Sequence, residues 1–269
     1  MSIAGISMYV APEPVAEATK AFWHFIRDHL RNAGLPDVPE ELDQAVDYRD
    51  VWLRPDLLLS QTCGFPYVKT LRDRVRLVAT PCYAYPGCDG PSMLSFIVIN
   101  KNAGISTREA LRGRRAAINS HDSNSGYNLF RAAIAPIADG APFFGDIIET
   151  GGHAASITAI LEGRADCAAI DCITYGNIAR YAPERVADIS ILAETPSGPG
   201  LPFITRASAS DRDVEMLRAA LGAALAEPRL AGARDRLGLV GFDMLSDRDY
   251  DRLQDLERDA MELEYPELA

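Results

Sequence analysis

The chain has 269 residues, of which 48% are hydrophobic, and a formal net charge of −11 at pH 7. This length and apolar content favour a globular protein large enough for two lobes of ordinary size. The acidic charge and the lack of any Lys/Arg-rich run argue against nucleic-acid binding, because phosphates would be repelled. The apolar runs are too short to span a membrane.

The N-terminal stretch Ile3–Val10 is apolar and predicts a first strand. A helix is predicted from Pro14 to Gly34, because apolar residues recur there at helical spacing. Tyr9 would lie at the carboxyl end of the strand, where ligands bind in open α/β sheets, although a tyrosine there is at least as often an ordinary core residue. The first residues lack the features of an export signal, so either the protein works in the cytosol or the signal is missing from this version.

A second strand, Leu57–Leu59, is predicted to end in polar side chains. The carboxyl edge of the sheet would then carry the side chains of Ser60, Gln61 and Thr62. A helix-like turn is predicted after them at residues 67–72. An ordinary turn between strand and helix explains this pattern about equally well. The elements predicted next are strands at 76–85 and 93–100 and a short helix at 104–114.

The segment from Ala116 to Pro136 carries the strongest functional signal. Small and apolar residues predict a buried strand, a polar cluster predicts a loop, and the pattern from Leu129 predicts a helix that ends before Pro136. The first amide groups of a helix lack intrahelical partners and lie at the positive end of its dipole, so this loop could hold an anion with neutral donors. Helix capping alone is the alternative, since the same residue types are the commonest N-caps. The candidate ligand residues of the loop are Ser123, Asn124, Ser125, Gly126 and Tyr127.

Two titratable residues are predicted at the same edge as this loop. His153 follows a strand and two glycines, and it could donate to an anion together with the loop hydroxyls or merely cap its own helix. Asp171 ends the strand predicted at 164–171, where it suits an amine, a hydroxyl or a cation on the ligand. A solvent-facing strand end is the alternative for Asp171.

The strand-then-helix units of the middle block predict parallel strands covered by helices on both faces. We therefore expect an inserted lobe at residues 95–194 and a discontinuous first lobe formed by 1–94 and 195–269. Two crossings between lobes would form a hinge. The elements predicted after the middle block are a returning strand at 203–206 and helices at 210–226 and 246–264.

Catalytic and metal-binding motifs are absent from the sequence, and the four histidines are scattered, so neither a metal nor a cofactor is expected. His121 and Asp122 lie beside the polar loop, where a local hydrogen-bonded pair is commoner than a catalytic dyad. Five cysteines include no zinc-like pair. Cys82 and Cys88 could form a bridge, while buried free thiols are the simpler expectation.

The order of these pieces resembles the substrate-binding proteins of phosphonate, phosphate and phosphite ABC importers, which have the type II periplasmic binding protein fold. The resemblance covers most of the chain, from near residue 3 to about residue 205, and the loop and the last strand are moderately specific as a pair. The segments that carry it are Leu59–Gly64, Asp122–Tyr127, Gly152–His153 and Gly163–Asp171.

This resemblance implies a two-lobed α/β fold with a two-stranded hinge and a ligand held between the lobes. It implies a non-catalytic protein that captures a small oxyanion, such as a phosphonate, a sulfonate or a phosphate ester, for an ABC permease. The expected form is a monomer that does not span the membrane. The expected location is periplasmic by resemblance, with a cytoplasmic location as the alternative because the sequence shows no signal peptide.

The resemblance also assigns roles to residues. The family's hydroxyl loop holds the phosphonyl oxygens, its histidine lies beside them, and its strand-end acid meets a ligand amino group. The chain has Asn124 where the family usually has threonine and Ala154 where it usually has an acid. The residues expected to bind ligand are Tyr9, Ser60, Gln61, Thr62, Ser123, Asn124, Ser125, Gly126, Tyr127, His153 and Asp171.

A cytosolic enzyme on the same two-lobed scaffold, acting on a small acidic metabolite, is the competing hypothesis. The lack of an export signal favours it, and turnover of a bound compound would identify it. A transcription-factor effector domain is disfavoured because no DNA-binding module is attached. The candidate acid/base groups of such an enzyme are His121, Asp122, His153 and Asp171.

Overall fold

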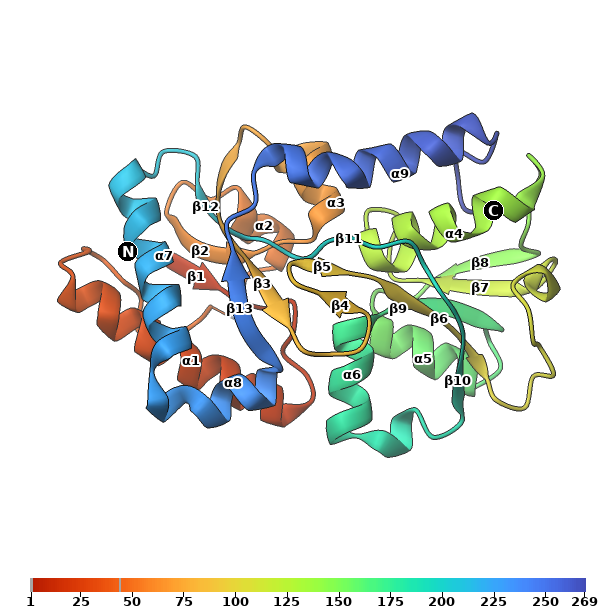
Figure 1. Ribbon diagram of the computed structural model, residues 1–269, viewed down its shortest axis with the longest axis horizontal. Coiled ribbons are helices and arrows are strands. Elements are labelled where there is room, and N and C mark those ends of the chain that lie inside the picture. Colours follow the sequence, from red (N-terminus) through yellow and green to blue (C-terminus); the bar gives the residue numbers. More distant parts are fainter. Residues whose placement is uncertain (1, 44) are drawn as a thin grey trace. The chain divides into compact units, whose positions relative to one another are not determined.

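The computed structural model describes residues 2–43 and 45–269, and the contacts among them divide the chain into two compact units. Figure 1 shows their elements coloured along the chain. The first unit comprises the chain up to Ala84 together with Asp89–Pro91 and Gly200–Asp249. The second unit comprises Tyr85–Cys88, Ser92–Pro199 and Tyr250–Ala269.

The first unit is built on a mixed sheet with the strand order β1-β2-β12-β3-β13. Strands β1 and β2 are parallel, whereas β12 and β13 run antiparallel to their neighbours. The predicted return of the chain at 203–206 is therefore confirmed, because β12 lies between β2 and β3. The strands are β1 (Ile3–Gly5), β2 (Leu57–Gln61), β3 (Val75–Tyr83), β12 (Phe203–Arg206) and β13 (Leu239–Asp243).

Three helices of the first unit form one core with its sheet. The fully buried side chains of Trp23 on α1 and Leu221 on α7 belong to the same apolar cluster as Leu59 on β2. An Asp–Ser capping box begins α7, as the sequence pattern at Ser210 predicts. The helices of this unit are α1 (Glu13–Asn32), α2 (Tyr48–Trp52), α3 (Gly64–Pro66), α7 (Asp211–Ala226) and α8 (Ala231–Leu237), with a π-helical turn at Tyr67–Leu71.

The first strand is shorter than the prediction of Ile3–Val10. It ends at Gly5, which is paired with Ser60 near the end of β2. Ile6 and Tyr9 are nevertheless buried, so their apolar character reflects packing and not a longer strand. Tyr9 consequently lies four residues beyond the strand and not at its end.

The second unit has a sheet with the strand order β10-β6-β9-β7-β8. Strands β9, β7 and β8 are parallel, as predicted, whereas β6 and β10 are antiparallel to their neighbours. The strands are β6 (Ser95–Asn100), β7 (Arg115–Ile118), β8 (Asp146–Glu149), β9 (Cys167–Asp171) and β10 (Ile189–Glu194). A separate small sheet contains β4 (Cys88–Asp89), β5 (Ser92–Met93) and β11 (Gly198–Pro199).

Helices cover both faces of the second unit's sheet, with α4 and α9 on one side and α5 and α6 on the other (Figure 1). Phe130 of α4 and Ala260 of α9 share a core cluster with Ile118 of β7. The helices are α4 (Leu129–Ala138), α5 (His153–Leu161), α6 (Cys172–Tyr181) and α9 (Asp251–Glu262).

The C-terminal segment Tyr250–Ala269 packs in the second unit, whereas the prediction placed residues 195–269 in the first lobe. Its contacts explain the difference: Asn128 Nδ2 donates to the carbonyl of Leu253 at 3.0 Å, and Phe144 N donates to Ala269 O at 2.8 Å. Helix α9 also starts later than the predicted Ser246, because residues Asp247–Tyr250 form a 3-10 turn.

Two other predicted helix boundaries were wrong. Helix α4 continues through Pro136 to Ala138. The proline is exposed in the last turn, and Arg112 donates to the carbonyls of Ile137 and Ala138 there. The helix predicted at 104–114 is reduced to the 3-10 turn Glu109–Leu111.

Candidate functional site

The polar loop after β7 forms a helical start, as the sequence predicts. A π-helical turn, Asn124–Asn128, runs directly into α4. Ser123 is the N-cap, and its Oγ accepts from Gly126 N at 3.1 Å. The first intrahelical bond runs from Asn128 N to the carbonyl of Ser123 at 3.0 Å, so the amide of Ser125 precedes it at the positive end of the helix. Ser123 and Ser125 are 8% and 5% exposed, so an anion there would be largely removed from water.

His153 lies against this loop. Its Nε2 is 2.9 Å from Ser125 Oγ, which joins the first residue of α5 to the loop after β7. The N-cap of α5 is Gly152 and carries no side-chain capping bond, so His153 does not cap its own helix. Burial lowers the pKa of His153 to about 4, against a smaller opposing effect of the Ala169 backbone. Because the residue is neutral at pH 7, it contributes a hydrogen bond and no charge.

A close backbone approach holds the loop in place. A Cβ on Gly126 would lie 2.5 Å from Asn119 Oδ1, so only glycine allows the Asn119 amide to pack here. Asn119 Oδ1 is buried without a hydrogen-bond partner within the described residues. Sequence reasoning did not select Asn119 as a site residue. Its position at the end of β7, with a side chain that hydrogen-bonds readily, is the signal that could have found it.

Asp171 lies at the same edge of the sheet. Ser95 is paired in register with Asp171 across β6 and β9, and Ser95 Oγ donates to the carbonyl of Ser125 at 2.9 Å. Asp171 is 1% exposed, so it is not a solvent-facing strand end. Its Oδ1 accepts from the amides of Ile173 and Thr174, both at 2.9 Å, and thereby caps α6. The structure therefore gathers Ser123, Ser125, His153 and Asp171 within the second unit.

Two loop residues have internal contacts that occupy their side chains. Tyr127 packs in the core of the second unit, and its hydroxyl accepts from Leu268 N at 3.3 Å. Asn124 Oδ1 accepts from Asn128 Nδ2 at 3.2 Å. The backbones of both residues form part of the helix start, and their side chains stabilise the turn.

His121 and Asp122 each contact another residue of the polar loop. Asp122 Oδ1 accepts from Ser120 Oγ, and the His121 ring contacts the Tyr127 ring with centroids 5.2 Å apart. Within residues 2–43 and 45–269, no three His, Cys, Asp or Glu side chains form a group that could hold a metal ion.

The candidate residues of the first unit are buried around the end of β2. Ser60 Oγ donates to Gly5 O at 2.7 Å, and Gln61 Nε2 donates to Leu201 O at 3.1 Å. Thr62 Oγ1 donates to Cys63 O at 3.3 Å. Tyr9 packs edge-on against Tyr83, with ring centroids 5.7 Å apart. These side chains order the local backbone, and a role for them in ligand binding stays a prediction.

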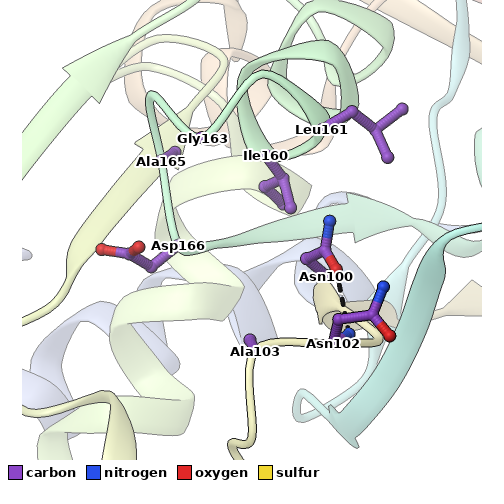
Figure 2. A pocket seen from close by; sticks show the side chains of 8 residues that line it. All are labelled: Asn100, Asn102, Ala103, Ile160, Leu161, Gly163, Ala165 and Asp166. Carbon is purple, nitrogen blue, oxygen red and sulfur yellow. Dashed lines mark hydrogen bonds between the residues drawn. The ribbon is translucent and has the colours of Figure 1, made fainter.

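A cavity of about 220 Å³ in the second unit lies at the other edge of its sheet. Asp166 precedes β9 and Asn100 ends the antiparallel β6, so both lie opposite the edge that carries Asp171 and Ser95. Figure 2 shows Leu161 and Ile160 at one side of this cavity and the Asn100–Asn102 turn at the other. It is therefore separate from the polar loop.

None of the described helices is both long and apolar enough to cross a membrane. Comparison with protein families gives a match over residues 56–250 to the family described as ABC transporter, phosphonate, periplasmic substrate-binding protein. A search of curated proteins found no match.

Three of the solved structures with a similar fold come from Prochlorococcus marinus, Pseudomonas aeruginosa and Xanthomonas citri. PhnD1 from Prochlorococcus marinus in complex with methylphosphonate is 15% identical with a TM-score of 0.72, and the match covers 96% of this chain and 97% of that chain. A binding protein component of an ABC phosphonate transporter from Pseudomonas aeruginosa is 17% identical with a TM-score of 0.70, covering 98% and 87%. A Xanthomonas citri protein bound to ATP is 17% identical with a TM-score of 0.70, covering 98% and 97%. The chain thus has the α/β fold of the two-lobed binding proteins, as predicted.

Proposed function

Because the chain belongs to the family of periplasmic substrate-binding proteins of phosphonate ABC transporters, we propose that it captures a small phosphonate through the polar loop after β7. The family is one of transport proteins and not of enzymes, so the enzyme hypothesis is not favoured. The observation that carries the proposal is the Ser125–His153 hydrogen bond of 2.9 Å beside the capped turn that starts at Ser123.

The chemistry of this loop suits an oxyanion. Phosphonyl oxygens accept hydrogen bonds and carry negative charge, and a helix start offers amide donors and the positive end of a dipole. Ser123 Oγ accepts from Gly126 N, which leaves the Ser123 O–H proton to donate to a ligand oxygen. Ser125 and the neutral His153 supply further hydrogen-bonding atoms without a counter-charge. Binding would thus depend on donors whose strength rises when water is excluded.

Asp171 defines the class of phosphonate that we propose. One carboxylate oxygen, Oδ1, serves the α6 cap, and a carboxylate has capacity for further donors. An ammonium group on the ligand is a donor of opposite charge, so its hydrogen bond to this carboxylate would be charge-assisted. We therefore propose an aminoalkylphosphonate as the preferred ligand over an alkylphosphonate. The proposed setting is the periplasm, with delivery to an ABC permease.

Calorimetric titration with an aminoalkylphosphonate, methylphosphonate, phosphate and sulfate tests this proposal. The Ser123→Ala/Ser125→Ala double variant should bind the aminoalkylphosphonate at least about tenfold more weakly, because two hydrogen bonds to a charged group are lost. Asp171→Asn should weaken the aminoalkylphosphonate selectively and leave methylphosphonate affinity within about threefold. Ser106→Ala is the matched control, since Ser106 is an exposed serine of the same unit. Equal affinities for the double variant and the wild type would refute the assignment of this loop.

A further inference from the structure

Two cysteine sulfurs are in contact in the second unit. Cys88 Sγ lies 3.5 Å from Cys172 Sγ, although the residues are 84 positions apart in sequence. All five cysteines of the chain are free thiols in the structure. The sulfur atom in contact with Cys88 Sγ therefore belongs to Cys172. The sequence suggests Cys82 as a possible bridging partner of Cys88, with free thiols as the simpler expectation. Cys172 is fully buried as the first residue of α6, whereas Cys88 is partly exposed.

The segment Tyr85–Cys88 packs along α6, and Tyr85 contacts both Asn177 and Gly176 of that helix. The Tyr85 hydroxyl is hydrogen-bonded to Asn177 Oδ1 at 2.6 Å. The Tyr85 ring lies so close to Gly176 that a Cβ on that glycine would be 2.4 Å from Cδ1 of the ring. The segment therefore has a defined position on the helix before it reaches Cys88.

The backbone of Gly87 packs directly against the side chain of Cys172. The φ of Gly87 is +90°, and a Cβ there would lie 2.9 Å from Cys172 Cβ. The backbone is held from the other side as well, because Leu94 N donates to Gly87 O at 3.1 Å and Cys172 N donates to Leu94 O at 3.2 Å. The two cysteines are thus brought together by a packed backbone, which is what a disulfide requires of its neighbours.

We propose that Cys88 and Cys172 are a redox-active dithiol that forms an intramolecular disulfide on reaction with a low-molecular-weight disulfide. The Cys88 thiolate attacks one sulfur of the oxidant, forms a mixed disulfide and releases one small thiol. Cys172 then loses its proton and attacks the Cys88 sulfur, which releases the second small thiol. Two protein thiols and one small disulfide become one protein disulfide and two small thiols.

The order of these steps follows from accessibility. Cys88 is the partly exposed member of the pair, so it meets the oxidant first. The hydrogen bond between Cys172 and Cys88, burial and the charge of Asp171 raise the pKa of Cys172 well above its ordinary value, so Cys172 does not react first. Because Cys172 is fully buried with its Sγ 3.5 Å from Cys88 Sγ, the disulfide that it can reach is the one formed on Cys88. The Cys88–Cys172 bond would fix Tyr85–Cys88 to the start of α6, directly after Asp171.

Peptide mapping of the purified protein after incubation with oxidised glutathione tests the proposal. Trypsin leaves Cys82 and Cys88 together in residues 77–101, and Cys167 and Cys172 together in residues 165–180. The experiment therefore uses the Cys82→Ala/Cys167→Ala variant, in which a link between these two peptides can only join Cys88 to Cys172. We expect the intact protein to lose about two hydrogen masses and the two peptides to be linked.

Tandem mass spectrometry of the wild-type peptides provides the second readout, should the double variant fail to fold. Cys88→Ser and Cys172→Ser should each abolish the link, while Cys63→Ser, which removes another partly exposed thiol, should leave it intact. The oxidised protein should also melt at a higher temperature than the reduced protein. A stable glutathione adduct on Cys88, a link between other cysteines, or five unreacted thiols would each overturn the proposal.

Discussion

Ser125 Oγ and His153 Nε2 lie 2.9 Å apart and join the loop after β7 to the first residue of α5. The parallel pairing of β7 with β8 brings these two segments to the same edge of the sheet. Because His153 is neutral at physiological pH, this pair offers an anion hydrogen-bonding atoms and no compensating charge.

The pH dependence of stability should report the burial of His153. Burial lowers its pKa from 6.5 to about 4, so the unfolded chain takes up this proton at a higher pH than the folded protein does. The contribution of this residue to stability is full above about pH 6.5 and is lost as the pH falls toward about 4, by on the order of 3 kcal/mol. Denaturant unfolding of wild type and His153→Gln between about pH 7 and about pH 4.5 measures this loss. An unfolding free-energy difference that stays constant over this range would contradict it.

Gly126→Ala should disturb the proposed anion loop. The new Cβ would lie 2.5 Å from Asn119 Oδ1 and 2.7 Å from Asn119 Cγ, so the Asn119 amide must move. We expect overpacking to cost about 1 to 3 kcal/mol of stability, together with a loss of phosphonate affinity. Gly152→Ala is the matched control, because a Cβ there meets nothing within 4 Å and its φ of 176° is ordinary extended backbone. Calorimetry and thermal unfolding should separate the two variants.

Arg131→Met should destabilise the second unit. The Arg131 side chain is 4% exposed, and its Nη2 lies 3.7 Å from Glu257 Oε1. It also donates to Pro266 O at 2.6 Å and to Asn128 Oδ1 at 2.7 Å. Removing it leaves buried acceptors unpaired, which should cost about 2 to 4 kcal/mol. Arg258→Met provides the comparison, since the Arg258 side chain is 61% exposed in its pair with Asp255 and should change stability by less than about 1 kcal/mol. Equal effects of the two variants in denaturant unfolding would refute this ranking.

Ser210→Ala should remove one half of the capping box of α7. Ser210 Oγ accepts from Asp213 N at 3.1 Å, and Asp213 Oδ2 accepts from Ser210 N at 3.0 Å. The loss should lower the unfolding free energy by about 1 kcal/mol. Ser208→Ala, at an exposed serine outside the helix, should have no measurable effect by chemical denaturation. A larger effect at Ser208 would contradict the prediction.

Local sequence patterns predicted most elements of the fold because their signals are periodic or chemical. The capping pair at Ser210 located α7, and the buried runs located β2 and β9. Boundaries set by tertiary packing were not predictable in the same way. Helix α4 passes Pro136 and ends at Ala138, where Arg112 donates to the carbonyl of Ala138, and β1 ends early because its pairing with β2 ends at Gly5.

The candidate site was predictable to the extent that each residue acts at a strand end or a helix start. The loop, His153 and Asp171 follow this rule, and the structure places them in one unit. Contacts between distant segments were not visible in the sequence. Tyr127 belongs to the same predicted loop as Ser123 and Ser125, yet its hydroxyl accepts from Leu268 N. Likewise, nothing in the local sequence connects Cys88 with Cys172.

The packing of Tyr250–Ala269 into the second unit affects how the chain can fold during synthesis. A ribosome releases Ser92–Pro199 well before this segment, so the nascent second unit lacks the partner that buries Phe130 and Tyr127. Local helices and strands can form at that stage, but the core closes only when Ala260 and Leu268 arrive. Completion of this unit therefore requires residues that are translated after Ser92–Pro199 and after the intervening Gly200–Asp249 of the first unit.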